Sequence, residues 1–183
     1  MTIRVIAVTG AVALAALVGA PAAADQAPIP LLTGSDLRID GLAVSQRLGA
    51  GVAAGDINGD GIADMVLGSP AASNNNRTSS GSVYVVFGTT QVGPVDLGNL
   101  GSGGFRIDGA ETSDGIPDGL ATADFNGDGK DDVLIGTPTA GSGGTAYVVF
   151  GRTATTPIDL NSLGSAGVRI DGAVSGDSLG ADV

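Results

Sequence analysis

The sequence predicts an all-β protein built from repeated units of about four short strands. Three observations support this fold class. Short apolar segments alternate with turns rich in Gly, Pro and Asn, and the 183-residue chain contains 32 Gly and 8 Pro. No segment keeps the periodicity of an amphipathic helix. The same motifs also return in the same order, at a spacing that matches the size of one β-propeller blade.

The motif spacing defines two full repeats and the start of a third. Arg-Ile-Asp-Gly begins at residues 38, 106 and 169, and an acidic loop begins at residues 56 and 124. Val83-Tyr-Val-Val-Phe-Gly88 returns as Ala146-Tyr-Val-Val-Phe-Gly151. The repeats differ in length between these markers, in the polar segment 71–80, which we expect to be a surface loop.

Four strands are expected in the first repeat, each for a different reason. Residues 49–55 are small and apolar, and residues 65–67 are Met-Val-Leu directly after the acidic loop. Residues 83–87 are β-branched and aromatic, and residues 105–108 alternate apolar with polar before an Asp-Gly turn. Tyr84 and Tyr147 occupy equivalent places in these strands and are predicted to be packing residues.

The two acidic loops predict cation binding. In Asp56-Ile-Asn-Gly-Asp-Gly-Ile-Ala-Asp64 and Asp124-Phe-Asn-Gly-Asp-Gly-Lys-Asp-Asp132, oxygen-bearing side chains stand at loop positions 1, 3, 5 and 9. Ca²⁺ takes six to eight oxygen ligands, whereas Mg²⁺ prefers to keep its waters. The alternatives are ordinary Asp-Gly turns or an EF-hand, which requires Glu at position 12, where this chain has Leu67 and Ile135.

Composition excludes several function classes. The net charge of −11 argues against nucleic-acid binding, because phosphates require a basic surface. The chain contains no His and no Cys, which excludes a Ser-His-Asp triad, a Cys nucleophile, a His-bearing zinc site and disulfides. We therefore expect a chain that is not an enzyme and that bound calcium holds together.

The N-terminus predicts export. Arg4 precedes an apolar run at residues 5–18, and Ala22-Ala-Ala24 forms a cleavage site before Asp25. Residues 1–24 are therefore predicted to be a secretory signal peptide, followed by a linker at residues 25–34. The alternative is an uncleaved membrane anchor, but the run is short for a span. No membrane span is expected after cleavage.

The combined motifs resemble the FG-GAP repeat of integrin α-chain β-propellers and their bacterial relatives. Phe87-Gly88 and Phe150-Gly151 match the FG element, and Gly68-Ser-Pro70 and Gly136-Thr-Pro138 match the GAP element. The resemblance implies that residues 35–183 form propeller blades, with repeat 1 at about 38–105, repeat 2 at about 106–168 and a partial repeat 3 at 169–183. About two and a half blades make an incomplete propeller, so we expect a fragment of a longer protein.

The resemblance also implies two Ca²⁺ sites, each within a β-hairpin. The ligand sets would be Asp56, Asn58, Asp60, Asp64 and the carbonyl of Ile62 in the first site, and Asp124, Asn126, Asp128, Asp132 and the carbonyl of Lys130 in the second. The leading hypothesis is a non-catalytic, calcium-stabilised adhesion or ligand-binding module. It would be secreted, periplasmic or at the cell surface, with a protein or carbohydrate ligand. The alternative is an accessory domain of a secreted hydrolase whose catalytic part lies outside this chain.

Overall fold

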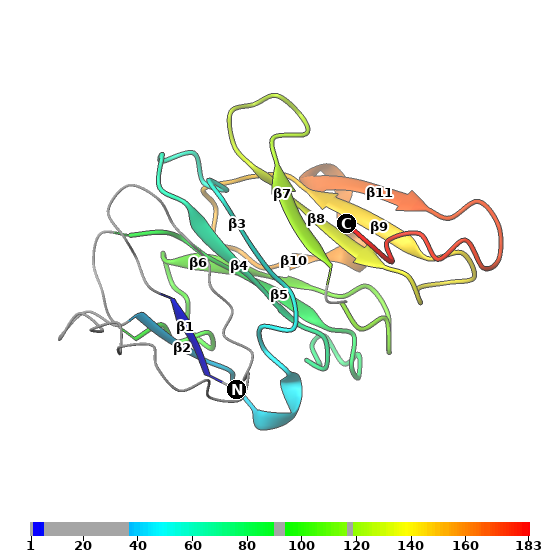
Figure 1. Ribbon diagram of the computed structural model, residues 1–183, viewed down its shortest axis with the longest axis horizontal. Helices are drawn as coiled ribbons and strands as arrows, with labels where there is room; N and C mark the ends of the chain where they lie inside the picture. The colour runs from blue at the N-terminus through cyan, green and yellow to red at the C-terminus, as the bar shows by residue number, and fades with distance from the viewer. Residues whose placement is uncertain (1, 6–36, 90–93, 117–118) are drawn as a thin grey trace, which may run out of the picture.

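The computed structural model describes residues 2–5, 37–89, 94–116 and 119–183. Two mainly antiparallel sheets lie side by side and contain most of the strands in this part of the chain (Figure 1). The only helices among them are three short 3₁₀ turns, η1 (Val44–Gln46), η2 (Leu160–Ser162) and η3 (Gly164–Ala166). The all-β fold class predicted from the sequence is confirmed.

Four strands of the first sheet follow one another in chain order. They are β3 (Val52–Gly55), β4 (Asp64–Ser69), β5 (Ser82–Val86) and β6 (Gly104–Asp108). Each strand pairs antiparallel with the next. The four predicted strands of the first repeat are therefore confirmed, with ends that differ by a few residues.

The second sheet repeats this arrangement. Its strands are β7 (Leu120–Ala123), β8 (Asp132–Thr137), β9 (Thr145–Val149) and β11 (Gly167–Asp171). The hairpin register is the same in both sheets, because Gly55 pairs with Asp64 and Ala123 pairs with Asp132. Both acidic loops therefore close equivalent hairpins, and both lie at the upper edge of the molecule in Figure 1.

The sheets do not begin and end with the sequence repeats. Residues 106–108, which open the second repeat, lie in β6 and complete the first sheet, and residues 169–171 complete the second sheet in the same way. Each blade thus takes its fourth strand, β6 or β11, from the following repeat. This is the arrangement of two adjacent propeller blades. The Arg-Ile-Asp-Gly motif forms the end of a strand and the turn that follows it, as predicted.

A short strand from the second repeat also joins the first sheet. β10 (Ile158–Asp159) pairs parallel with β6, with Ile158 opposite Ile107. The sequence pattern did not predict this strand. It places the segment that leads to β11 against the first sheet and so ties the two sheets together.

The main core lies between the two sheets. Val66, Val85 and Phe105 from the first sheet pack in one cluster with Val133 and Tyr147 from the second. A second cluster covers the other face of the first sheet and includes Tyr84. Tyr84 and Tyr147 are each 1% exposed, so both are packing residues, as predicted.

The N-terminal predictions lie mostly outside the described residues. Of the predicted signal peptide, the structure describes only β1 (Thr2–Val5), which pairs antiparallel with β2 (Leu37–Asp40). The predicted linker at 25–34 falls entirely outside. Signal cleavage and these domain boundaries stay predictions. Among the described residues, no helix has the length and apolar character needed to cross a membrane.

Candidate metal sites

Asp56 organises the first acidic loop from its first position. Its Oδ1 accepts the main-chain N–H of Gly59 at 2.8 Å and of Asp60 at 3.0 Å, and its Oδ2 accepts that of Gly61 at 2.8 Å. Three N–H groups therefore point toward one carboxylate. This is how a loop between two strands closes tightly without a helix.

Asn58 and Asp60 lie next to Asp56 on the loop surface. The Asp60 N–H, already bonded to Asp56, also donates to Asn58 Oδ1 at 2.8 Å. The Asn58 amide in turn donates to Asp60 Oδ2 at 3.0 Å. Side-chain oxygens from loop positions 1, 3 and 5 are thus gathered on one small exposed surface.

Asp64, at position 9, lies beneath the loop and is fully buried. Its Oδ2 accepts the N–H groups of Ile57 at 2.9 Å and Asn58 at 3.1 Å, while its Oδ1 accepts that of Gly88 at 2.7 Å. Burial raises the pKa of this carboxyl to about 6, and the three N–H donors oppose that shift only in part. Asp64 connects the base of the loop to the end of β5.

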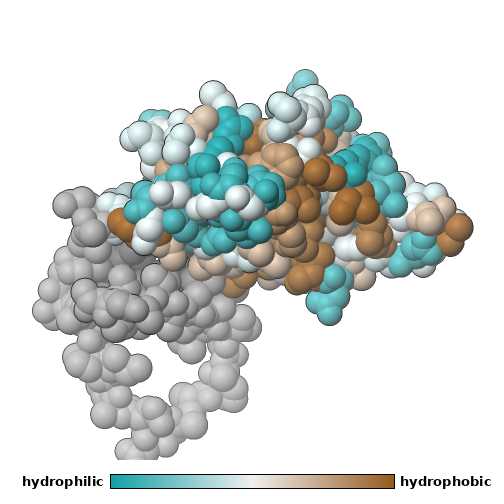
Figure 2. Space-filling model, turned by 90° about the horizontal axis from the view of Figure 1, so that it is seen from above, coloured by the Kyte–Doolittle hydropathy of each residue, from teal (hydrophilic) through white to brown (hydrophobic). Residues whose placement is uncertain are grey.

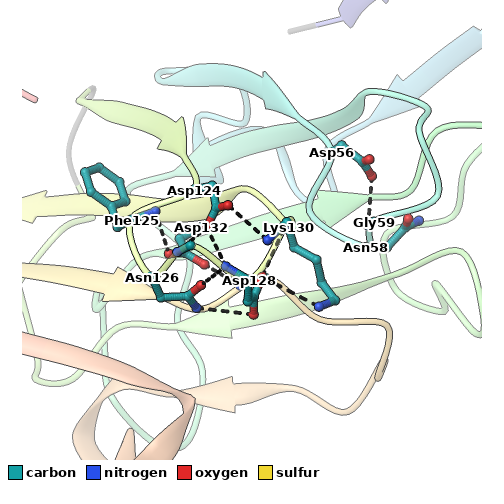
Figure 3. Close-up of polar contacts among 12 residues, drawn as sticks. Asp56, Asn58, Gly59, Asp124, Phe125, Asn126, Asp128, Lys130 and Asp132 are labelled. Atoms are coloured by element: carbon teal, nitrogen blue, oxygen red, sulfur yellow. Dashed lines mark hydrogen bonds and ion pairs between the residues drawn. The ribbon is translucent and has the colours of Figure 1, made fainter.

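The second loop repeats these contacts. Asp124 accepts the N–H groups of residues 127, 128 and 129, and Asn126 Oδ1 accepts that of Asp128 at 2.8 Å. Asp132 is fully buried and accepts the N–H groups of Phe125 at 3.1 Å and Gly151 at 2.9 Å. Figure 3 shows these acidic side chains gathered around the loop, whereas the Phe125 ring points away from it.

The loop residues at position 7 differ in charge. Ile62 and Lys130 each donate a main-chain N–H to the Asp at position 5, at 2.8 Å and 2.9 Å. The Lys130 ammonium also lies 3.6 Å from Asp128 Oδ1, and the main-chain donor and the ammonium lower the pKa of Asp128. The second loop therefore carries a cationic group of its own, which the first loop lacks.

The glycines at position 6 meet a conformational requirement. Gly61 and Gly129 have φ of 84° and 86°, in the left-handed region that other residues rarely adopt. No atom lies within 4 Å of a Cβ built at either residue. Backbone geometry, not space, therefore selects Gly there.

The donor chemistry of both loops fits a hard cation. Each loop offers carboxylate and amide oxygens from positions 1, 3 and 5, the ligand types that Ca²⁺ prefers. Within the described part of the chain, however, no three acidic side chains converge closely enough to form a preassembled metal cluster. The structure thus brings the predicted residues of each loop together, and it places Asp64 and Asp132 below the loop as hydrogen-bond acceptors.

Sequence reasoning missed Asp131, at position 8 of the second loop. Its Oδ2 accepts the N–H of Asp56 at 2.9 Å, and its own N–H donates to the Asp56 carbonyl at 2.9 Å. Position 8 of the first loop is Ala63, so the repeat pattern carried no signal for this role.

Comparisons with known proteins identify the repeats in this chain. The family model described as FG-GAP repeat matches residues 48–86 and 113–149. The chain is 36% identical over 111 residues to a phosphatidylinositol-glycan-specific phospholipase D of Rattus norvegicus and 38% identical over 112 residues to that of Homo sapiens, covering 57% of this chain in each case. It is 29% identical over 113 residues, 61% of this chain, to integrin alpha-4 of Xenopus laevis. The matched segments span only 13% of the two phospholipases and 10% of the integrin.

Proposed function

We propose that this chain, which carries FG-GAP repeats, is a non-catalytic calcium-binding module of an exported protein. The two hairpin loops each bind one Ca²⁺, and the bound ions stabilise the blades. The module presents its loops and blade surfaces to a protein or carbohydrate ligand outside the cell or in the periplasm.

The observation that carries the proposal is the duplicated loop geometry. Two loops far apart in the sequence use the same side chains for the same contacts, from Asp56 and Asp124 at position 1 to Asp64 and Asp132 at position 9. In the first loop, no basic side chain pairs with these carboxylates among the described residues. A bound cation would relieve the repulsion between neighbouring carboxylates.

The residues at positions 1, 3 and 5 would hold the ion first, because they are the accessible oxygen donors. Asp64 and Asp132 would join from position 9 by exchanging some of their N–H contacts for the metal. Calcium supplies charge neutralisation and cross-linking of the hairpin, and it performs no chemical step. Extracellular sites of this kind bind with dissociation constants of roughly 0.1–1 mM.

Thermal unfolding of the full chain tests this proposal. Millimolar Ca²⁺ should raise the melting temperature relative to EDTA, because an ion that binds only the folded state stabilises it. Asp60→Ala combined with Asp128→Ala should abolish this increase. Asp96→Ala, which removes an exposed carboxylate outside both loops, should retain it. Equal melting temperatures in Ca²⁺ and EDTA would refute calcium stabilisation.

A second candidate function is supported by the phospholipase matches. The chain would then be an accessory module of a larger hydrolase, with the catalytic part encoded elsewhere in the same protein. Reading the coding sequence on both sides of this segment distinguishes the two functions. A flanking catalytic domain would favour the hydrolase, and further repeats alone would favour a binding or adhesion protein.

Export itself is tested by N-terminal sequencing of the protein recovered from the producing cells. The proposal expects a mature chain that begins at Asp25. Recovery of the intact N-terminus in the cytoplasmic fraction would contradict it.

A further inference from the structure

The two acidic loops lie next to each other on one face of the molecule. Both lie at the upper edge in Figure 1, and Figure 2, which views this edge from above, shows hydrophilic side chains gathered there. A Cβ built on Gly59 of the first loop would lie 3.0 Å from Lys130 Cγ of the second. The Lys130 side chain thus lies against the first loop, while its ammonium lies 3.6 Å from Asp128 Oδ1 in its own loop (Figure 3).

One residue of the second loop holds both main-chain polar groups of Asp56. The Asp131 carboxylate accepts the Asp56 N–H, and the Asp131 N–H donates to the Asp56 carbonyl, both at 2.9 Å. Asp56 stands at position 1 of the first candidate site, and its carboxylate accepts three N–H groups of its own loop. The position of this expected ligand residue therefore depends on the second loop.

The same two hydrogen bonds orient a peptide of the second candidate site. The Lys130 carbonyl and the Asp131 N–H belong to one trans, planar peptide unit, so they point in opposite directions. Because the N–H donates to Asp56, the Lys130 carbonyl points away from the first loop. This carbonyl is the main-chain ligand expected at position 7 of the second site. Its orientation consequently depends on Asp56.

Other hydrogen bonds between the sheets involve no expected ligand of either loop. The Thr122 hydroxyl donates to the Ala54 carbonyl at 2.7 Å, and the Arg152 N–H donates to the Ile57 carbonyl at 2.7 Å. Position 8 of the first loop is Ala63, whose side chain cannot accept a hydrogen bond as Asp131 does. The Asp56–Asp131 pair is therefore a feature of this boundary and not of the repeat.

We infer that calcium binding at the two loops is positively coupled through the Asp56–Asp131 hydrogen-bond pair, an inference that rests on the calcium binding proposed above. An ion that fixes Asp56 also fixes the peptide that carries the Lys130 carbonyl. The second ion then meets a loop that has already lost part of its conformational freedom, so its binding costs less entropy. By linkage, the effect is the same whichever loop fills first.

Repulsion between the two bound ions opposes this coupling. The tips of both loops are exposed to solvent, however, and each ion is accompanied by the carboxylates of its own loop. At an ionic strength of about 0.15 M, salt screens the interaction between exposed charges over about 8 Å. Titration at this ionic strength therefore reports mainly the coupling through the protein.

Calcium titration of the full chain and of two single-loop variants tests the inference. Asp60→Ala leaves the second loop as the binding site, and Asp128→Ala leaves the first. If the loops are independent, the overall constant for binding two ions equals the product of the two single-site association constants. The coupled loops should give an overall constant at least about fivefold larger than that product.

Substitutions at Asp131 identify the hydrogen-bond pair as the link. In an Asp131→Ala background, the same three measurements should give a ratio close to one. Asp131→Asn keeps an acceptor oxygen for the Asp56 N–H and should retain most of the coupling. Thr122→Val is the matched control, because it removes a hydrogen bond between the sheets that involves no expected ligand, and it should leave the ratio unchanged.

Amide hydrogen exchange provides a second readout. Calcium fills only the first loop of Asp128→Ala, where exchange of the Asp131 amide should slow, because its acceptor belongs to Asp56. Calcium fills only the second loop of Asp60→Ala, where exchange of the Asp56 amide should slow for the reciprocal reason. Both amides should slow more than the amide of Val85, which lies in β5 and serves as the reference.

The outcomes distinguish the coupling from the proposed function. Calcium binding in the full chain and in both single-loop variants, with an overall constant equal to the product, would overturn the coupling alone. No calcium binding in any of the three proteins would overturn the proposed function and the coupling together. Equal loss of the ratio in Thr122→Val and Asp131→Ala would show that general blade packing, and not the Asp56–Asp131 pair, links the loops.

Discussion

The Asp131 carboxylate accepts the main-chain N–H of Asp56 at 2.9 Å, across the boundary between the two sheets. The Asp131 N–H completes the pair by donating to the Asp56 carbonyl at 2.9 Å. Position 8 of the second loop is thereby fixed to position 1 of the first. Two hydrogen bonds therefore join the two candidate metal loops directly across the sheet boundary.

The first prediction concerns this link. Asp131→Ala should lower the free energy of unfolding by about 1–3 kcal/mol, because it leaves the Asp56 N–H without its acceptor. Asp131→Asn keeps one acceptor oxygen and should cost less. Urea unfolding measures both, with the exposed Asp182→Ala as a control. A loss no larger than that of the control would contradict the proposed role of Asp131.

The second prediction concerns the glycine of the FG element. A Cβ on Gly88 would lie 2.4 Å from the Ala63 carbonyl oxygen and 2.7 Å from Ile62 Cγ2, so the loop backbone would have to move. Gly88→Ala should therefore destabilise the chain by about 1–3 kcal/mol, as overpacking does. At Gly103 the nearest atom would be 3.2 Å away, and Gly103→Ala should cost clearly less. Equal melting temperatures for the two variants would contradict the close approach.

The third prediction compares equivalent ion pairs in the two sheets. Arg106 Nε and Arg169 Nε lie 2.6 Å and 2.7 Å from Asp108 and Asp171, but the Asp108 side chain is 2% exposed and that of Asp171 is 58% exposed. Asp108→Ala leaves a partly buried guanidinium without its partner and should cost about 3 kcal/mol. Asp171→Ala should change stability little. Similar losses at both sites in chemical denaturation would contradict the role of burial.

The fourth prediction is a pH dependence in calcium-free protein. Burial raises the pKa of Asp64 from 3.8 to about 6, so the folded chain favours the protonated form. The stability that this shift contributes is present below about pH 3.8 and is lost as the pH rises through about 6. Asp64→Asn should remove that part of the decrease. Parallel stability profiles for the original chain and the variant, measured by denaturant unfolding at stepped pH, would count against a buried, titrating Asp64.

The fold was largely predictable because its signals are local and repeated. Apolar segments, Asp-Gly turns and motif spacing predicted both sheets and both hairpin loops. The contacts between the sheets were not predictable, because they depend on residues that differ between the repeats. Asp131 replaces Ala63, and Thr122 replaces Ala54, so no repeated pattern marks either residue.

The sequence predicted which residues make up each candidate site, but it did not predict how those residues are arranged. Loop spacing identified the residues at positions 1, 3, 5 and 9, and the structure gathers the first three at the surface. The role of Asp64 depends on the N–H of Gly88, which lies in a different part of the chain. A long-range contact of this kind leaves no trace in the loop sequence.

The most direct test of the central claim is the number of calcium ions bound per chain, measured by equilibrium dialysis of the full chain. The proposal of one Ca²⁺ in each hairpin loop predicts two ions per chain, falling to one in Asp60→Ala and to one in Asp128→Ala. Asp96→Ala should still bind two. A chain that binds no calcium at millimolar concentration, while its far-ultraviolet circular dichroism shows folded β-structure, would contradict the account.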